Sequence, residues 1–473
     1  MTYDLYFFKN ALPNAKIKTY KKDSNNFFSE KKIKGFCIDS RKIQKEELFI
    51  ALSGQRVDGH YYIEDVLLNG AIGLIIQKDK INLLNKINEK VLNGKIVIIV
   101  DDTLDALKQL AKNWRKGFKF PIIGITGSVG KTTTKQLLAS IFKTAKISAF
   151  ISFKNQNTVI GLSLNILKMR KEHKFAVFEM GISHKGEMEE LANILRPDIG
   201  VITYICNAHT KGLGNLKEII NEKQKIFKYF KSDNVGIIWG DKSFLDSYYY
   251  DFPIITFGLK TKNHIQARMI KNVDSNFTKF NLKIYFKKYP VTIKSNHLGF
   301  INNILAASSI ATFLKIETKF IIQGIQNYKD FEGRFERRKI KNNKGILIND
   351  SYNASPESMK AALKAFSALK NEGKKIAVLG DMLELGEKEV FWHRQIGRIL
   401  SKNLDLNKII LVGKLAENIA KTMPAILKGR TTKVKDWKAA KELLDEMLLE
   451  SNNQILLKAS RGIGLDNIIK DLT

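Results

Sequence analysis

Short apolar runs alternate with segments of helical periodicity along most of the chain. Runs typical of buried strands occupy residues 122–125, 175–178, 199–205 and 235–239. Between them, apolar positions recur at helical spacing over residues 132–142, 186–195 and 216–230. This alternation predicts a parallel sheet that helices cover on both faces.

The same alternation resumes in the last third of the chain. Strand-like runs occupy residues 346–348, 375–379, 408–412 and 454–457, and helical patterns occupy residues 356–369, 390–400, 415–422 and 437–449. They predict a second, doubly wound unit of the Rossmann type. Residues 257–290 instead form short alternating segments rich in Lys and Asn, which indicates an antiparallel edge.

The first hundred residues form a further region. They end in a predicted strand, 95–100, and a predicted helix over 103–116 leads from it into the central block. A chain of 473 residues has room for about three domains. We therefore expect an α/β protein with domains at residues 1–102, 103–328 and 329–473.

Composition and charge narrow the possible partners. Hydrophobic residues make up 44% and charged residues 27%, which excludes a disordered, collagen-like or disulfide-scaffold protein. The formal net charge of +32 raises the question of a nucleic-acid or anionic-membrane partner. The lysines are spread through every domain, however, and do not cluster with aromatic residues, so we expect no nucleic-acid partner.

The sequence predicts a cytoplasmic protein without membrane insertion. Residues 295–314 are uncharged, but Ser, Asn, His and Thr interrupt them, so they indicate a buried helix rather than a membrane span. The N-terminus has early charges and does not resemble a signal peptide. Cys37 and Cys206 have no metal-site spacing and suit a reducing compartment.

A glycine-rich loop stands between a predicted strand and a predicted helix, and its sequence is Gly124-Ile-Thr-Gly-Ser-Val-Gly-Lys-Thr132. Loops of this kind bind phosphate through backbone N–H groups and the positive end of the helix. Lys131 would reach the β- and γ-phosphates of ATP, and the Thr132 hydroxyl would ligate Mg²⁺. Ile125 stands where the strict pattern has Gly. The candidate contacts to the nucleotide are Gly124, Thr126, Gly127, Ser128, Val129, Gly130, Lys131, Thr132 and Thr133.

A phosphate loop alone does not define a reaction. A GTPase would carry an Asn-Lys-x-Asp motif, and none of the three Asn-Lys pairs has Asp in the required place. Glu179, at the end of a predicted strand, is a candidate Mg²⁺ ligand. His209 follows the next strand as a candidate metal ligand or phosphate partner. Cys206 and His209 could form a nucleophilic pair, but their short loop gives little support for one.

Several motifs together resemble the Mur ligase family. They are Gly124–Thr134, Phe178-Glu-Met-Gly181, Asn207-Ala-His209, Gly333-Arg334, Asp350-Ser-Tyr-Asn-Ala-Ser-Pro356 and Leu379-Gly-Asp-Met-Leu-Glu-Leu-Gly386. In the first domain, Asp39-Ser-Arg41, Leu48–Gly54 and Asp58-Gly-His60 are similar to the family's uridine-nucleotide-binding segment. The resemblance covers nearly the whole chain, with the motifs in the same order.

The resemblance implies an ATP-dependent ligase that forms an amide bond through an acyl phosphate. The motifs are most similar to those of the members that add D-alanyl-D-alanine to a UDP-N-acetylmuramoyl tripeptide, a cytoplasmic step of peptidoglycan synthesis. A sister ligase for another amino acid and a folylpolyglutamate-synthase-like ligase remain alternatives within the family. A basic ATPase that binds nucleic acid and a catalytically dead scaffold are the alternatives outside it.

The resemblance also implies roles for single residues. The catalytic group would be Lys131, Lys223, His209 and Arg334, and the ligands of about two Mg²⁺ ions would be Thr132, Glu179, His209 and Lys223, the last as a carbamate. Asn302 would contact the adenine, Arg334 the γ-phosphate and Asp350 the ribose. The substrate contacts would be Ser40, Arg41, Asp58, Gly59, His60, Asn155, Asn157, Thr158, Asn353 and Pro356. We expect a monomer.

Two positions depart from the family's pattern. Ile301 replaces the usual His before Asn302, and the neighbouring Asn303 makes the register ambiguous. Thr210 and Lys211 follow His209, where an apolar residue and Glu are usual. The second departure changes the charge beside the predicted metal site.

Overall fold

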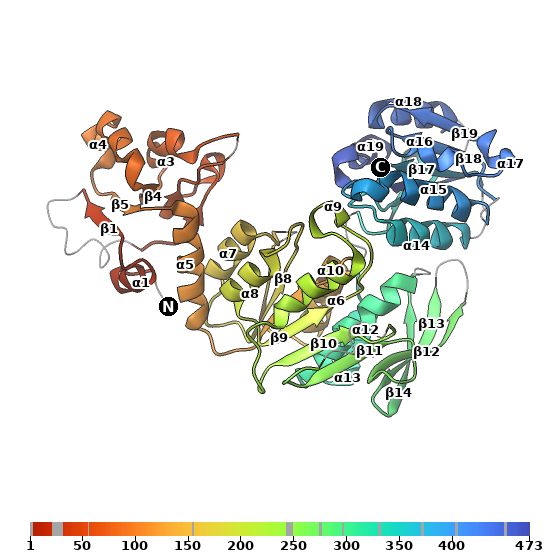
Figure 1. The fold of residues 1–473 in the computed structure, drawn as a ribbon, viewed down its shortest axis with the longest axis horizontal. Coiled ribbons are helices and arrows are strands. Elements are labelled where there is room, and N and C mark those ends of the chain that lie inside the picture. The colour runs from red at the N-terminus through yellow and green to blue at the C-terminus, as the bar shows by residue number, and fades with distance from the viewer. Residues whose placement is uncertain are drawn as a thin grey trace. The chain divides into compact units, whose positions relative to one another are not determined.

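The computed structural model describes residues 3–20, 32–54, 56–153, 156–242, 249–273, 277–295, 298–329, 333–369, 373–402, 405–448 and 452–473. Across these residues the strands form three sheets, and each sheet lies within one of the three predicted ranges (Figure 1). The expected three-domain α/β architecture is confirmed. The domain boundaries themselves remain predictions.

The first sheet has the strand order β1-β5-β4-β3-β2. Strand β1 is antiparallel to β5, and the other pairs are parallel. The strands are β1 (Lys16–Thr19), β2 (Gly35–Cys37), β3 (Glu47–Ile50), β4 (Gly73–Gln77) and β5 (Ile96–Val100), and the accompanying helices are α1 (Leu5–Ala11), α3 (Ile63–Leu68) and α4 (Glu89–Leu92). Phe49, Leu74 and Val97 pack in the core of this domain.

The second sheet has the order β14-β13-β12-β11-β10-β9-β6-β8-β7. Its strands are β6 (Ile122–Thr126), β7 (Ala149–Ile151), β8 (Phe175–Glu179), β9 (Ile199–Ile202), β10 (Val235–Trp239), β11 (Ile254–Gly258), β12 (Ile265–Asn272), β13 (Thr278–Ile284) and β14 (Lys287–Ile293). Strands β9 to β12 pair in parallel, whereas β12, β13 and β14 pair antiparallel. The predicted antiparallel edge therefore starts at β12, not at residue 257.

The helices of the central region largely follow the predicted pattern. They are α5 (Thr103–Lys116), α6 (Lys131–Thr144), α7 (Val159–Leu167), α8 (Glu187–Leu195), α9 (Thr210–Leu213), α10 (Leu216–Gln224), α12 (Leu298–Phe313) and α13 (Thr318–Gln326). The side chain of Asp102 caps α5 by accepting a hydrogen bond from Asp105 N at 2.6 Å. Within the uncharged run, Leu298–Phe313 form the helix α12, so the expected helix is present.

Two central elements are shorter than predicted. Strand β9 ends at Ile202, not at residue 205, because the backbone beyond it binds the phosphate loop: Tyr204 O accepts from Ser128 N at 2.9 Å. The helix predicted over 216–230 ends at Gln224 and continues as a 3₁₀ turn over Lys225–Phe227.

The third sheet has the order β15-β16-β20-β17-β18-β19. Its strands are β15 (Glu336–Lys339), β16 (Gly345–Asn349), β17 (Lys375–Gly380), β18 (Lys408–Val412), β19 (Thr431–Val434) and β20 (Asn453–Lys458). Its helices are α14 (Pro356–Ser367), α15 (Glu389–Leu400), α16 (Glu417–Ala420), α17 (Ala425–Lys428), α18 (Trp437–Met447) and α19 (Asp466–Leu472). All pairs are parallel except β15 with β16. Two apolar clusters pack around this sheet.

By its contacts the chain divides into two compact units. The first contains residues 1–124, 148–182 and 187–198, and the second contains residues 125–147, 183–186 and 199–473. Within the described residues, no helix is both long enough and apolar enough to cross a membrane.

Candidate functional site

The phosphate loop connects β6 to α6, in the strand–loop–helix context that the sequence predicts. Gly127 has φ 144° and Gly130 has φ 95°, values that favour glycine. A Cβ on Gly127 would lie 1.9 Å from Thr203 Oγ1, and one on Gly130 would lie 2.2 Å from Asn303 Oδ1. Both close approach and backbone conformation therefore require glycine at these positions.

The segment after β9 holds the loop in place. Thr203 Oγ1 lies 2.8 Å from Val129 O, to which it donates, and Ser128 Oγ donates to Cys206 O at 2.9 Å. Cys206 N donates back to Ser128 Oγ at 3.1 Å. These bonds fix the loop before any ligand binds, so its anion-binding groups are preorganised.

Lys131 and Thr132 open helix α6. The first N–H groups of a helix have no partner within it and carry partial positive charge, which suits a phosphate. Lys131 Nζ lies 2.8 Å from Gly127 O, so its side chain lies back along the loop. Thr132 is buried at the start of the helix. This arrangement can bind the phosphates of a nucleotide.

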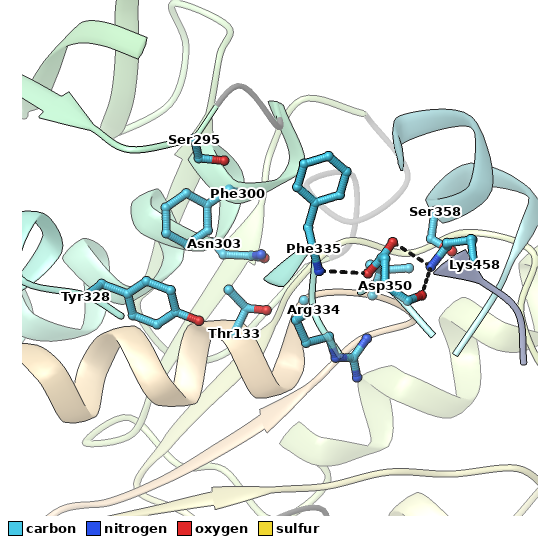
Figure 2. Close-up of a pocket in the computed structure, with 12 residues that line it drawn as sticks. Thr133, Ser295, Phe300, Asn303, Tyr328, Arg334, Phe335, Asp350, Ser358 and Lys458 are labelled. Atoms are coloured by element: carbon cyan, nitrogen blue, oxygen red, sulfur yellow. Dashed lines mark hydrogen bonds and ion pairs between the residues drawn. The ribbon is translucent and has the colours of Figure 1, made fainter. Parts of the chain in front are cut away.

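A cavity in the second unit adjoins this loop (Figure 2). It encloses about 650 Å³, including its mouth, which is open to solvent. The lining residues come from the phosphate loop, from α6, α12 and α14, from the segments after β14 and α13, and from β20 and the segments next to β15 and β16. They are Val129, Gly130, Thr133, Ser295, Phe300, Asn303, Tyr328, Arg334, Phe335, Asp350, Ser358 and Lys458. Residues far apart in sequence thus surround one space beside the phosphate loop.

The two sides of the cavity differ in chemistry, as Figure 2 shows. On one side the rings of Phe300 and Tyr328 pack together, with centroids 5.2 Å apart. On the other side Asp350 pairs with Lys458 at 2.8 Å and accepts from Phe335 N at 3.1 Å. An aromatic wall facing a carboxylate suits a base and a ribose, respectively.

Arg334 enters the same cavity. Its guanidinium lies over the ring of Tyr352, 4.1 Å from the ring centroid, and Arg461 lies 5.6 Å from that centroid. Arg334 Nε is buried and has no hydrogen-bond partner among the described residues. A buried donor without a partner indicates that a bound anion would satisfy it.

The adenine contact predicted at Asn302 is not tested by the structure. Asn303 lines the cavity, whereas Asn302 Oδ1 is buried with no partner in the described part of the chain. The ambiguous register of this pair in the sequence corresponds to these two different environments.

Lys223 is completely buried at the end of α10. Burial, and then the charge of Lys131, hold the pKa of Lys223 well below its usual value. The neighbouring Glu222 is engaged elsewhere: its carboxylate accepts from Gly186 N at 2.8 Å and pairs with Lys225 at 2.7 Å. Lys223 therefore favours the neutral amine, the form that combines with carbon dioxide.

Cys206 does not fit the role of a nucleophile. Burial and the nearby Glu357 raise the pKa of the thiol well above its usual value. The other member of the suggested pair, His209, is engaged through Nδ1 by Glu384. The geometry thus gives a Cys206–His209 pair no support.

The loop that carries His209 meets the Gly380–Gly386 motif. Besides the His209–Glu384 pair, Thr210 Oγ1 donates to Leu385 O at 2.8 Å and Lys211 N donates to Glu384 O at 3.2 Å. The His209 interaction holds the pKa of Glu384 below its usual value. Two motifs predicted separately from the sequence therefore form one contact, which links the central and third sheets. The role of His209 beside a metal stays a prediction.

Among the described residues, no group of three His, Cys, Asp or Glu side chains could hold a metal ion by itself. Oxygen ligands that suit Mg²⁺ are nevertheless present. Thr132 provides a buried hydroxyl in the second unit, and Glu179 provides a buried carboxylate in the first. Mg²⁺ commonly binds through one or two such groups together with substrate phosphates, so each of these residues by itself carries a group that suits it.

In the first unit, Glu179 lies close to one predicted substrate contact, Asn157. Asn157 Nδ2 donates to Glu179 Oε1 at 3.1 Å, and Gly181 N donates to Asn157 O at 3.0 Å. Thr158 caps α7 through its side chain. Asn155, a further predicted contact, lies outside the described residues.

The predicted uridine-nucleotide segment has two structured turns. Asp39 binds Arg41 through two hydrogen bonds, of 2.8 and 3.0 Å, and Arg41 holds the pKa of that carboxyl well below its usual range. The second turn begins at Asp58, followed by Gly59 and the buried His60. Ser40 lies in the first turn, between Asp39 and Arg41.

His60 is engaged at both ring nitrogens. Nδ1 lies 2.6 Å from Asp58 Oδ1, and Nε2 accepts from Gln77 N at 3.0 Å. These bonds join the turn to β4, so His60 positions the turn rather than offering a free ring nitrogen to a ligand. Arg41, whose side chain is 84% exposed, is the more available cation.

The sequence interpretation missed six of the cavity residues, and it named Asn303 only for the ambiguous register. The six are Ser295, Phe300, Tyr328, Phe335, Ser358 and Lys458. Lys458 is the last residue of β20, and the apolar pattern predicts that this strand is buried. A charged residue at the end of a buried strand is the one sequence signal that could have identified Lys458 as a site residue. The predicted substrate contacts Asn353 and Pro356 are neighbours of residues that line the cavity. Asn353 O accepts a hydrogen bond from Lys458 Nζ at 2.7 Å, and Pro356 begins α14, the helix that carries Ser358.

Comparisons with known proteins agree with this geometry. Residues 32–115 match the Mur ligase family catalytic domain, residues 125–311 the Mur ligase middle domain, and residues 333–461 the Mur ligase glutamate ligase domain. The chain is 34% identical to the UDP-N-acetylmuramoyl-tripeptide–D-alanyl-D-alanine ligase of Bacillus subtilis, over 95% of both chains. The corresponding Escherichia coli ligase is 27% identical, over 92% of both chains.

Solved structures give the same result. MurF from Acinetobacter baumannii superposes with a TM-score of 0.85 and 25% identity, covering all of this chain and 99% of the other. MurF from Thermotoga maritima, in complex with ADP, gives a TM-score of 0.79 and 26% identity, covering 93% and 97% of the two chains. The phosphate loop, the cavity beside it and these matches lead to one conclusion: the chain belongs to the Mur ligase family.

Proposed function

We propose that this chain is an ATP-dependent ligase that joins D-alanyl-D-alanine to a UDP-N-acetylmuramoyl tripeptide. The observation that carries the proposal is the cavity whose wall combines the phosphate loop with Arg334, Asp350 and Lys458. The identity to curated ligases of this specificity supports the choice of substrates over those of a sister ligase. The reaction would be a cytoplasmic step in the synthesis of peptidoglycan precursors, carried out by a monomer.

The chemistry has two steps. A carboxylate oxygen of the tripeptide attacks the γ-phosphorus of ATP, the bond to the ADP oxygen breaks, and an acyl phosphate forms. The amine of D-alanyl-D-alanine then attacks the acyl carbon, phosphate leaves, and the amine loses a proton as the C–N bond forms. Because the first step brings two anions together, positive groups must stabilise their approach.

The cations of the cavity suit this task. Lys131 and the N-terminus of α6 would bind the β- and γ-phosphates, and the unsatisfied Nε of Arg334 would bind the transferring group. Asp350, held by Lys458, would accept hydrogen bonds from the ribose, and the Phe300–Tyr328 wall would pack against the adenine. Asn302 remains a candidate contact to the base.

Thr132 and Glu179 would be ligands of Mg²⁺, which neutralises phosphate charge when it is bound. A carbamate formed from the Lys223 amine and carbon dioxide would add an anionic oxygen ligand. The burial of Lys223 and its lowered pKa support this role. His209, oriented by Glu384, would lie beside the second metal position.

The uridine diphosphate of the substrate would bind the first domain. Ser40, Arg41 and the turn of Asp58, Gly59 and His60 are the candidate contacts, with the exposed Arg41 facing the diphosphate. Asn157 and Thr158, near Glu179, would bind the sugar-peptide part, and Asn353 and Pro356 would shape the pocket near the nucleotide.

A product assay tests the proposal. The purified chain receives ATP, Mg²⁺, the UDP-muramoyl tripeptide and D-alanyl-D-alanine, and mass spectrometry follows the UDP-muramoyl pentapeptide while ADP is measured separately. We expect equal amounts of pentapeptide and ADP, and a Lys131→Ala variant that remains folded but loses roughly 10²–10³-fold in turnover. ADP without pentapeptide would contradict the assigned acceptor, and no ADP would contradict the ligase itself.

A further inference from the structure

The tip of the β13–β14 hairpin has an unusual composition. Ile284 pairs with Lys287, so Tyr285 and Phe286 alone form the connection. Two-residue connections favour Gly, Asn or Asp, because they require a positive φ, and Tyr285 indeed has φ 51°. Phe286 is 94% exposed, so burial does not compensate for the unfavourable turn residues.

Tyr285 is anchored, whereas Phe286 is not. Tyr285 N donates to His264 O at 2.9 Å, and the rings of Tyr285 and His264 have centroids 5.9 Å apart. Phe286 therefore projects from a turn that is held in place at its base. A large apolar ring in this position suits contact with an apolar environment outside the chain.

Lysines face one another across the same strands. The register places Lys283 opposite Lys288 on β13 and β14, and Lys271 opposite Lys279 on β12 and β13. Like charges directly opposite destabilise a sheet. In the described part of the chain, none of these four lysines forms an ion pair, so nothing there offsets the repulsion.

The surrounding sequence provides almost no negative charge. From Leu259 to Lys294 there are nine Lys and Arg residues and one acidic residue, Asp274. Protection of an edge strand explains the exposed Lys288 and Pro290 on β14. It does not explain Lys279 and Lys283, which lie on the inner strand β13, nor the aromatic tip.

We propose that this hairpin docks the protein on a membrane surface rich in anionic lipid. Phe286 lies at the tip, Lys283, Lys287 and Lys288 lie beside it, and Lys279 lies at the other end of β13. Lipid headgroups complement the lysines, and the boundary of the acyl chains complements the ring. This combination favours a bilayer over single-stranded nucleic acid, because successive bases require several stacked aromatic rings, whereas of the two rings at the tip Tyr285 packs against His264 and only Phe286 projects. Association would be peripheral and sensitive to salt.

Vesicle sedimentation of the full chain tests the proposal. Vesicles of equal parts phosphatidylglycerol and phosphatidylcholine are compared with vesicles of phosphatidylcholine alone, at low and at high salt. We expect binding to the anionic vesicles only, lost at high salt. Each lysine at the surface contributes about fivefold in affinity, so the double variant Lys283→Gln/Lys288→Gln should bind roughly 25-fold more weakly.

A matched control separates a local site from net charge. Lys421→Gln/Lys428→Gln removes the same charge from two exposed lysines of the third domain and should leave vesicle binding unchanged. Thermal unfolding followed by circular dichroism verifies that both double variants fold. Equal weakening in both would overturn the proposal, because it would show a general effect of charge.

A fluorescent probe at the tip gives an independent measurement. In the Phe286→Trp variant, the added tryptophan should shift to shorter wavelength on anionic vesicles and be quenched by brominated lipid, whereas Tyr249→Trp, at another exposed aromatic, should not respond. No shift at residue 286 would contradict insertion. Tighter binding of a single-stranded RNA oligomer, weakened by Lys283→Gln/Lys288→Gln, would assign the surface to nucleic acid and overturn the lipid proposal.

Discussion

Lys223 and Lys458 are both fully buried in the second unit, yet their surroundings are opposite. Lys458 Nζ lies 2.8 Å from a carboxylate oxygen of Asp350 and 2.7 Å from Asn353 O. The side-chain amine of Lys223 has no hydrogen bond or ion pair within the described residues, and burial, followed by the charge of Lys131, lowers its pKa. The first surroundings hold a cation, whereas the second favour a neutral amine.

A third buried lysine shows which case is ordinary. Lys375 pairs with Asp405 at 2.6 Å and donates to two carbonyl oxygens, those of Ser367 and Leu369. It follows the pattern of Lys458, because a buried charge needs a partner. Lys223 departs from this pattern, and such a departure is what the proposed chemical role predicts, because a buried lysine that only stabilised the fold would have a partner.

The largest expected effect is on activity, at Lys223. Lys223→Ala should lower kcat/KM roughly 10²–10³-fold, because the carbamate ligand can no longer form. Acetate in the assay should restore part of the turnover, since a free carboxylate can replace the lost anion. Steady-state kinetics measure both effects. Lys217→Ala, on the same helix but exposed, is the control. Full activity of Lys223→Ala would contradict the proposal that Lys223 takes part in the reaction.

For the stability of the fold we expect the reverse order: substitutions of Lys458 and Lys375 should destabilise the protein, and a substitution of Lys223 should not. Lys458→Met and Lys375→Met each leave a carboxylate without its partner, and each should lower the free energy of unfolding by about 3–5 kcal/mol. Lys223→Met removes a buried amine that has no partner, and it should be neutral or stabilising. Urea unfolding measures all three variants. A similar loss in all three would show that the two kinds of lysine do not differ.

The pH dependence sharpens the comparison at Lys458. Burial lowers the pKa of Lys458 from its usual 10.5, although Asp350 opposes the shift. Between the lowered pKa and 10.5 the unfolded chain binds more protons, so the stability of the wild type rises with pH in that window. The free-energy difference between the wild type and Lys458→Met should therefore increase as pH approaches 10.5. If urea unfolding showed that this free-energy difference does not change with pH, the lowered pKa of Lys458 would be excluded.

The smallest effect concerns the contact between His209 and Glu384. Their side chains are 21% and 54% exposed, so the pair should contribute about 1 kcal/mol or less to stability. Glu384→Gln should change the urea midpoint little but lower kcat a few-fold, because the His209 loop loses its orientation. Glu387→Gln, on an exposed residue three positions later, is the control. Equal kinetics in both variants would show that the contact has no positioning role.

Local patterns predicted much of this molecule. The phosphate loop was predictable because glycine positions, strand and helix occur within one short segment, and Gly127 and Gly130 have the required conformations. The buried strands were predictable because each is a continuous apolar run. The same reasoning predicts strand up to residue 205, but β9 ends at Ile202 and Tyr204 O accepts from Ser128 N instead.

Long-range pairs were not predictable in this way. Lys458 resembles any other lysine in a basic chain, and its partner Asp350 lies more than a hundred positions earlier. The aromatic wall joins Phe300 and Tyr328 from different segments, and no periodicity connects them. His60 stays a predicted ligand contact, but the bonds of its ring to Asp58 and Gln77 were not predictable from the sequence.

The most direct test of the ligase proposal follows the oxygen atoms of the carboxylate. The terminal carboxylate of the UDP-muramoyl tripeptide is labelled with ¹⁸O, and the phosphate released during turnover is analysed by mass spectrometry. An acyl phosphate predicts that one labelled oxygen per turnover appears in inorganic phosphate, with ADP as the other product. Unlabelled phosphate, or label in AMP, would contradict the account.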